Sequence, residues 1–217
     1  VLSLGDGATK NLVMTAGVML GGAANQAGCL YGGYNNKITI TGGQFMGGQV
    51  SFSTHPVKGD TTGKTETVGG VGGNIRLEGT TSYNTGTANI SGVAITGGYS
   101  ESFAGNFNAT YYKVLKLSDS YVADGNSKDY GGNIAIAANS TTATYEDLII
   151  NAGRATRGAN LYSGSTNARA ELVNCYVVDG YATTYAGNFH AGRIGYFGNA
   201  HRYVRLGFFQ QALAQLA

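Results

Sequence analysis

Apolar and polar residues alternate in short segments along most of the chain. In the segment Lys113–Leu117, for example, Leu115 and Leu117 flank the polar residue Lys116. A period of two residues is typical of a β-strand with one buried face. Gly- and Asn-rich stretches separate these segments and favour turns. Helical spacing is poorly supported before residue 200, so the pattern predicts an all-β chain.

A short phrase of two small residues, Asn and an apolar residue recurs along the chain. Its Asn residues are separated by 32, 27, 27 and 28 positions, and a weaker copy, Ala27–Leu30, has Cys29 in place of Asn. Five Asn residues in one register indicate an internal repeat. The residues predicted to form this ladder are Asn74, Asn106, Asn133, Asn160 and Asn188.

A second phrase keeps the same spacing and places Gly at positions 97, 125, 153 and 180. The two phrases are out of phase, so each repeat contains at least two strands separated by turns. One repeat is too short to bury its own apolar side chains and must stack on its neighbours. Asn tolerates a left-handed backbone, and its amide bonds along such a stack. The repeat therefore predicts an all-β solenoid, a parallel β-helix with coils of about 27 to 28 residues.

The stretch Glu171–Gly180, followed by Ala186–Phe189, resembles a coil of the right-handed parallel β-helix proteins of the pectin-lyase-like superfamily. The likeness covers roughly residues 27 to 195 and implies the right-handed form of the fold. That superfamily includes lyases, hydrolases, adhesins, autotransporter passengers and tail spikes. The resemblance therefore implies an architecture and leaves the activity open.

The ends of the chain depart from the repeat, although we expect a single domain over residues 1–217. Residues 1–26 lack the Asn phrase and are expected to form an N-terminal coil or a cap, and residues 27–195 form the repeat coils. Residues 44–71 lengthen one coil, which predicts a protruding loop around His55–Asp60.

Residues 196–217 are expected to cap the C-terminal coil, because a solenoid must cover its last repeat. A helix that binds a partner is the alternative. The apolar residues with helical spacing are Leu206, Phe209, Leu213 and Leu216.

Composition narrows the classes of partner. The chain has 14 basic and 12 acidic residues and no basic stripe, which argues against nucleic acid. No apolar run approaches the roughly 20 residues that a membrane-spanning helix needs. Cys29 and Cys175 lie several coils apart in the repeat, so we expect two buried thiols and no disulfide.

Four acidic residues are candidates for catalysis. Alignment of the coils on the second phrase puts Ser91, Asp119, Asp147 and Asn174 in one column, with about 4.8 Å between neighbours. Asp119 and Asp147 could then act as acid and base, or bind Ca²⁺ as the one cofactor considered. Asp124 and Asp179 form a second pair, two coils apart. Solvated turn residues are the alternative interpretation of all four.

Three Asn-x-Ser/Thr sequons mark candidate glycosylation positions at Asn89, Asn108 and Asn139. Asn108 and Asn139 closely follow a ladder Asn, so we expect both to lie outside the core.

We expect a non-catalytic structural or adhesive protein of the extracellular space or the cell surface. Charge is low, 15 Tyr residues are present, and the Gly-His-Gly motif of polygalacturonase-like hydrolases is missing. Free strand edges at the ends of a β-helix permit self-association into filaments or contact with other surface proteins. The alternatives are a polysaccharide lyase or glycoside hydrolase, and a spike that binds carbohydrate in a Tyr-lined groove.

Overall fold

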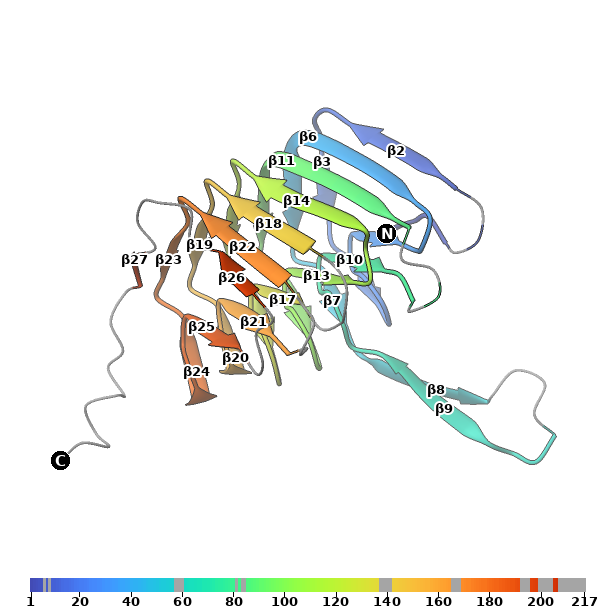
Figure 1. Cartoon of the computed structure of the whole chain (residues 1–217). Coiled ribbons are helices and arrows are strands. Elements are labelled where there is room, and N and C mark those ends of the chain that lie inside the picture. The colour runs from blue at the N-terminus through green and yellow to red at the C-terminus, as the bar shows by residue number, and fades with distance from the viewer. Residues whose placement is uncertain are drawn as a thin grey trace.

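The structure, a computed structural model, describes residues 1–206 except 6, 8, 57–60, 81, 83–84, 137–141, 165–168, 192–195 and 199–204. These residues form a parallel β-solenoid of about six turns, which confirms the predicted fold (Figure 1). The described residues contain no helix. Strands that neighbour one another in each sheet of the solenoid come from successive coils, and three such sheets surround the core.

The first sheet has seven strands, one from each coil. Its strands are β1 (Leu2–Ser3), β5 (Leu30–Gly32), β10 (Ile75–Glu78), β13 (Phe107–Thr110), β17 (Ile134–Ile136), β21 (Leu161–Ser163) and β25 (Phe189–Ala191). Each begins directly after the residue at the ladder position, so the repeated phrase sets the register of the whole sheet.

The second sheet has 12 strands, because most coils contribute two strands that meet at a corner. In β6 (Lys37–Met46) and β11 (Thr87–Thr96) a single long strand passes through this corner. The other coils supply β2 (Asn11–Met14) and β3 (Val18–Leu20), β14 (Val114–Ser118) and β15 (Tyr121–Ala123), β18 (Thr142–Glu146) and β19 (Ile149–Asn151), β22 (Arg169–Val173) and β23 (Tyr176–Val178), and β26 (Tyr196–Gly198) and β27 (Arg205–Leu206).

The third sheet has six short strands. They are β4 (Ala23–Ala24), β7 (Gln49–Val50), β12 (Tyr99–Ser100), β16 (Asn126–Ser127), β20 (Arg154–Arg157) and β24 (Tyr181–Tyr185). Strands β1 to β4 all pair with the following coil and so extend the three sheets toward the N-terminus.

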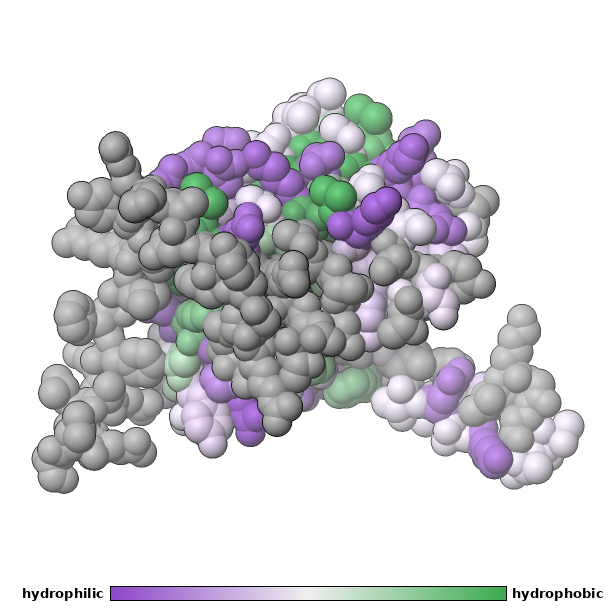
Figure 2. Space-filling view, viewed as in Figure 1, coloured by the Kyte–Doolittle hydropathy of each residue, from purple (hydrophilic) through white to green (hydrophobic). Residues whose placement is uncertain are grey.

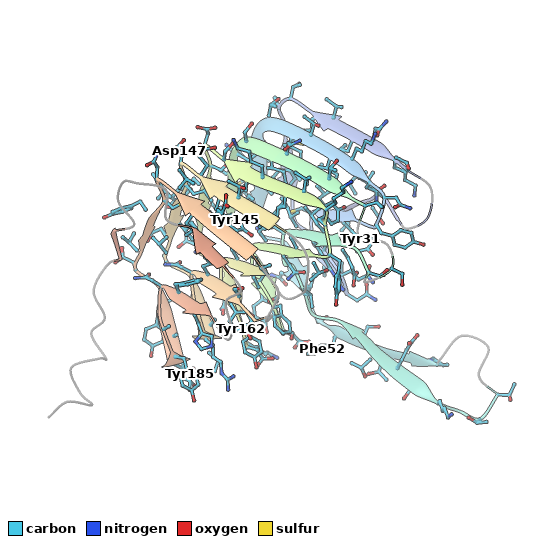
Figure 3. The ribbon with its side chains drawn as sticks, in the orientation of Figure 1. Tyr31, Phe52, Tyr145, Asp147, Tyr162 and Tyr185 are labelled. Atoms are coloured by element: carbon cyan, nitrogen blue, oxygen red, sulfur yellow. The ribbon has the colours of Figure 1, made fainter. Side chains whose placement is uncertain are left out.

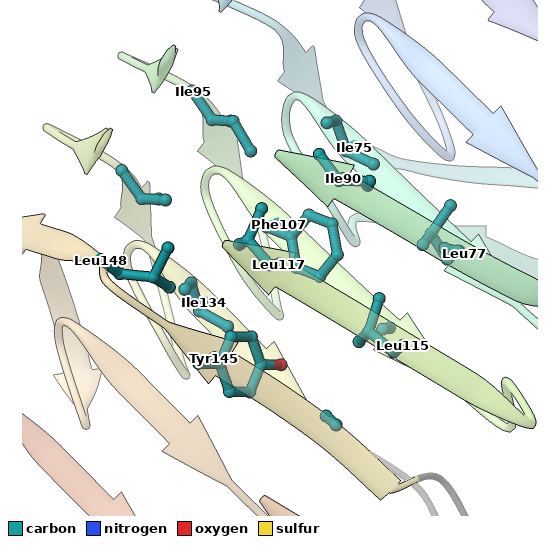
Figure 4. Packing of buried hydrophobic residues seen from close by; sticks show 14 of the residues in the cluster. Ile75, Leu77, Ile90, Ile95, Phe107, Leu115, Leu117, Ile134, Tyr145 and Leu148 are labelled. Carbon is teal, nitrogen blue, oxygen red and sulfur yellow. The ribbon is translucent and has the colours of Figure 1, made fainter. Parts of the chain in front are cut away.

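The core consists of columns of apolar side chains that point into the solenoid. Ile75, Phe107 and Ile134 occupy equivalent positions on successive coils and are fully buried (Figure 4). Burial of such a side chain contributes about 1.5–3 kcal/mol, and each coil supplies several. The alternation of apolar and polar residues in the sequence therefore corresponds directly to the inside and outside of the solenoid.

Three corners of the coil are built from single residues with a left-handed backbone. The first column contains Gly42, Gly92, Asp119, Asp147 and Asn174; the second contains Gly47, Gly97, Asp124, Ala152 and Asp179; the third contains Gly72, Ala104, Gly131, Gly158 and Ala186. Gly, Asn and Asp adopt this conformation more readily than other residues, which explains their frequency at these corners.

These corners correct the alignment made from the sequence. Ser118 pairs with Ser91, so Asp119 is equivalent to Gly92 and not to Ser91. At the second corner Gly97 is equivalent to Asp124, while Gly98 is the counterpart of Gly125. The Gly97–Gly98 doublet allowed a shift of one residue in the alignment.

The insertion comprises fewer residues than the sequence suggested, and it has regular secondary structure. Residues 44–50 stay within the coil as the end of β6 and as β7, whereas β8 (Phe52–Pro56) and β9 (Thr65–Gly69) form an antiparallel hairpin. The hairpin projects away from the solenoid (Figure 1). The predicted protrusion is therefore confirmed, but His55 and Pro56 lie on a strand of the hairpin and not in a loop, and 57–60 lie outside the described residues.

At the other end, β26 and β27 continue the second sheet as far as Leu206. Residues 207–217, and with them most of the predicted capping helix, lie outside the described residues. No helix with the length and hydropathy required to cross a membrane occurs in the part of the chain that the structure describes.

Candidate functional site

The Asn ladder is continuous over five coils. The Nδ2 atoms of Asn74, Asn106, Asn133 and Asn160 each donate to Oδ1 of the next ladder Asn, over 2.7 or 2.8 Å. The same Nδ2 atoms donate to a backbone carbonyl of the following corner, and each Oδ1 accepts from a Gly N–H, as Asn133 Oδ1 does from Gly125. Both ends of the inner amides are thus saturated, and the predicted ladder is a structural element with no capacity left for a ligand.

Cys29 ends the ladder on the N-terminal side. Its Sγ lies 3.4 Å from Asn74 Oδ1 and 3.9 Å from the Met46 carbonyl oxygen, in the place of an Asn amide. Burial is the main cause that raises the pKa of the Cys29 thiol, and the same holds for Cys175. Both cysteines are free and buried, as expected, and neither has the lowered pKa of a nucleophilic thiolate.

The two predicted acidic pairs lie at two different corners. Asp119 and Asp147 occupy adjacent coils of the first corner, and their side chains are exposed. Asp124 and Asp179 lie at the second corner, where Ala152 separates them by one coil. The structure therefore brings Asp119 and Asp147 together but does not join the two pairs into one site.

The surroundings of Asp119 and Asp147 carry net negative charge. The one cation described nearby, Lys116, forms an ion pair with Glu146 in which Nζ and Oε2 are 2.6 Å apart. Its pKa is raised, first by the hydrogen bond and charge of Glu146 and then by the charges of Asp119 and Asp147. Among the described residues, no group of three or more His, Cys, Asp or Glu side chains is arranged to hold a metal ion.

An open groove of about 790 Å³ follows the first corner along the solenoid; we call it the turn groove. Its lining comes from five successive coils: Gly17, Val18, Gly43, Gln44, Gly92, Val93, Ala94, Asp119, Ser120, Tyr121, Asp147 and Ile149. Hydrophilic side chains gather along the edge where β14, β18 and β22 end (Figure 2), and Asp147 lies at this edge (Figure 3). The turn groove thus contains two of the predicted site residues, Asp119 and Asp147.

The floor of the turn groove belongs to one outward-facing column. Strand register aligns Ala94, Tyr121, Ile149 and Tyr176 on successive coils. Tyr121, Ile149 and Tyr176 are 39%, 48% and 41% exposed, which is unusual for such large apolar side chains in a row. The next residue on each strand points into the core, so this exposure follows from the alternation.

A second surface feature, which the sequence analysis missed, is a stack of rings on the opposite side of the molecule from Asp147 (Figure 3). We call it the aromatic stack; it comprises Phe103, Tyr130, Arg157, Tyr162, Tyr185 and His190. The ring centroids of Phe103 and Tyr130 are 4.8 Å apart, and those of Tyr162 and His190 are 5.6 Å apart with nearly parallel planes.

The Arg157 guanidinium extends this stack, with its Cζ atom 5.4 Å from the Tyr130 ring and 5.0 Å from the Tyr185 ring. Burial lowers the pKa of His190, and the charge of Arg157 lowers it further. A signal for the stack existed in the sequence: its members stand three residues before, or two residues after, a ladder Asn.

The three sequons differ in their surroundings. Asn89 is exposed on β11, whereas Asn139 lies outside the described residues. Asn108 is fully buried and its Nδ2 donates to the Ala135 carbonyl, so the expectation that it lies outside the core is wrong. The neighbours of Asn108 on its strand point inward, so Asn108 points outward. A turn covers the column of side chains to which Asn108 belongs. On the next coil the equivalent residue is Ala135, and a Cβ atom added to Gly131 in that turn would lie 2.9 Å from the Ala135 Cβ.

Comparison of the chain with protein-family models, with curated proteins and with solved structures gives no match. The resemblance to the pectin-lyase-like superfamily is therefore supported only at the level of a parallel solenoid with an Asn ladder.

Proposed function

We propose that this chain is a non-catalytic solenoid that serves a structural or adhesive role in the extracellular space or at the cell surface. The observation that carries the proposal is the arrangement of exposed side chains in columns, each repeated from coil to coil. A catalytic site needs different groups that converge on one reacting atom. Columns instead suit repeated, weak contacts with an elongated partner.

The stiffness of the scaffold supports the same role. The Asn ladder runs through the solenoid from Asn74 to Asn188, and a ring stack accompanies the later coils on the outside. Side-chain hydrogen bonds thus join successive coils in addition to strand pairing, which suits a structural role. Association into filaments is part of the same proposal, because unpaired strand edges at the end of a solenoid can add a second copy.

The competing function is a polysaccharide lyase or glycoside hydrolase that uses Asp119 and Asp147. Their adjacency in one column favours it, since paired carboxylates on one face are the usual requirement for glycoside hydrolysis. Against it, both side chains are exposed and the described cation beside them, Lys116, is paired with Glu146.

A combined retention and turnover assay tests the proposal. The protein is passed over a panel of immobilised polysaccharides and cell-wall fractions, and released saccharides are measured in the flow-through. We expect retention on at least one surface with no released product. Turnover by the wild type that disappears in the Asp119→Asn/Asp147→Asn variant would establish the enzyme instead. Absence of retention, together with a monomeric sedimentation profile at all concentrations, would reject a structural or adhesive role.

A further inference from the structure

The turn groove runs along the solenoid axis and crosses the strands at their ends. Its lining residues come from five successive coils, and four coil spacings of about 4.8 Å give a length of about 19 Å. Backbone groups at this corner are already used within the stack, as Asp119 N–H donates to the Glu146 carbonyl and Asp147 N–H to that of Val173. A partner in the groove must therefore be recognised by side chains, not by strand addition.

The charge of the groove favours a partner of opposite charge. The lining contains Asp119 and Asp147 but no Lys, Arg or His. Lys116 interacts with both charges, but its ammonium group is paired with Glu146, so it offsets only part of the negative charge. Counting these four charged residues, the local charge is one positive against three negative, so the complementary partner is a cation.

The floor of the groove selects a partner with flat apolar faces. Tyr121 and Ile149 are exposed side by side on adjacent coils, and Tyr176 continues the column beyond the groove. Tyr and aliphatic side chains in this position suit stacking against the apolar face of a sugar ring. The rings of the aromatic stack instead pack against one another, stacked or tilted, at centroid distances of 4.5 to 6.1 Å, so less of each face is left for a ligand.

The spacing between coils matches the repeat length of a sugar polymer better than that of an extended peptide. In an extended peptide, side chains on one face recur every two residues, or about 6.6 Å, which is out of step with coils about 4.8 Å apart. A pyranose ring in a linear chain spans roughly one coil spacing. In a β-1,4-linked chain successive rings are inverted, so rings of the same orientation can meet equivalent positions on every second coil.

We propose that the turn groove binds a linear amino-sugar polymer with free, protonated amines, laid parallel to the solenoid axis. The sugar rings pack over Tyr121, Ile149 and Ala94, while an amine on the side of the chain that faces the corner reaches Asp119 and Asp147. This inference rests on the proposed function, and it names the partner class that an adhesive surface of this kind would bind.

The test measures binding of a glucosamine hexamer by isothermal titration calorimetry, at low salt and at a pH that keeps the amines protonated. The N-acetylglucosamine hexamer is the matched neutral ligand. The matched variants are Asp119→Asn/Asp147→Asn and, as control, Asp124→Asn/Asp179→Asn, whose residues have the same left-handed backbone at another corner. Asn tolerates that conformation, so both variants are expected to fold.

We expect the wild type to bind the amine form about fivefold or more tightly than the acetylated form, because two ion pairs at the protein surface add about that much affinity. Asp119→Asn/Asp147→Asn should remove this preference, and the control variant should keep it within about twofold. Tyr121→Ala should weaken binding of both hexamers, because it removes part of the stacking surface.

Equal affinity of the wild type for the two hexamers, equal losses in the two double variants, or no binding of the amine form would overturn the inference. The proposed function fails separately, through loss of retention on all surfaces or through turnover. A protein that is retained on other polysaccharides but ignores the glucosamine hexamer would keep its adhesive role and lose only this partner.

Discussion

Tyr145 illustrates at the scale of one residue how tightly the coil interior constrains its contents. Its side chain is fully buried in the core, and its hydroxyl has no hydrogen-bond partner. Burial raises the pKa of this phenol far above its ordinary value, so it stays neutral. An unpaired buried hydroxyl costs about 1–3 kcal/mol.

Tyr145→Phe should therefore stabilise the protein by about 1 kcal/mol or more, measured as the free energy of unfolding in urea. Tyr112→Phe is the matched control, because the Tyr112 hydroxyl donates to the carbonyls of Gly32 and Gly33 and its loss should destabilise the fold. A destabilised Tyr145→Phe variant would mean that the hydroxyl has a partner in solution.

Cys29 gives a second prediction at the residue scale. It stands where an Asn would donate to Asn74 Oδ1 and to the Met46 carbonyl, and both acceptors are in place. Cys29→Asn should extend the ladder by one coil and stabilise the protein by about 1 kcal/mol, the usual net value of an added buried hydrogen bond. Cys29→Ala, which adds no donor, separates this gain from the removal of the thiol. Similar midpoints for the two variants in thermal unfolding would contradict the extension.

Individual residues also show which features of the structure could be predicted from the sequence and which could not. The ladder Asn residues recur in every coil with the same neighbours, so their position and role could be predicted from spacing. The burial of Asn108 could not, because alternation places it outside and only the fold-back of the turn covers it. The alignment of Asp119 with Gly92 was missed by one position for a different reason: Ser, Gly and Asp are all plausible in a turn, and only strand pairing distinguishes them.

At the scale of an element, the β8–β9 hairpin shows how an insertion is attached to a solenoid. The Phe52 N–H donates to Glu101 Oε2 over 2.7 Å, and Lys128 Nζ lies 2.6 Å from Glu101 Oε1. The hydrogen bond from Lys128 is the first cause that lowers the pKa of Glu101, followed by the bond from Phe52. The sequence located this insertion through its length but could not show a hairpin, because its Thr-rich segment lacks apolar alternation.

The lowered pKa of Glu101 predicts how the hairpin attachment depends on pH. A depressed carboxyl pKa means that the interaction is present above the ordinary Glu pKa of about 4.3 and is lost as pH falls through the lower, folded value. The amide proton shift of Phe52 in an NMR titration should change with a midpoint below that of exposed Glu residues. Glu101→Gln, which cannot ionise, should abolish the inflection; a midpoint at or above the ordinary Glu pKa of about 4.3 would contradict the attachment.

For the whole molecule, the repeat makes one coil a removable unit. Asn106 and Asn133 are equivalent ladder residues 27 positions apart, joined by an Nδ2 to Oδ1 bond. Deletion of residues 107–133 would connect Asn106 directly to Ile134 and preserve the ladder, the corners and the core columns. In a solenoid each coil contacts only its neighbours, so we expect a folded protein that is shorter by one coil.

Circular dichroism and small-angle scattering would check this, with deletion of residues 107–119 as the control that disrupts the register. The control should fail to fold because it displaces each apolar column from the core. If both deletions fold equally well, coil register does not determine the structure. If neither folds, the coils are not interchangeable.

The aromatic stack also has an optical consequence. The chain contains no Trp, so its ultraviolet emission comes from Tyr alone and no indole masks it. Tyr130 and Tyr162 are held with their ring centroids 4.5 Å apart, and Phe103 adjoins them. Rings this close, in a fixed chiral arrangement, couple their electronic transitions and should give a near-ultraviolet dichroic band that disappears when adjacent coils separate. The aromatic stack therefore provides an intrinsic spectroscopic probe of the contact between coils.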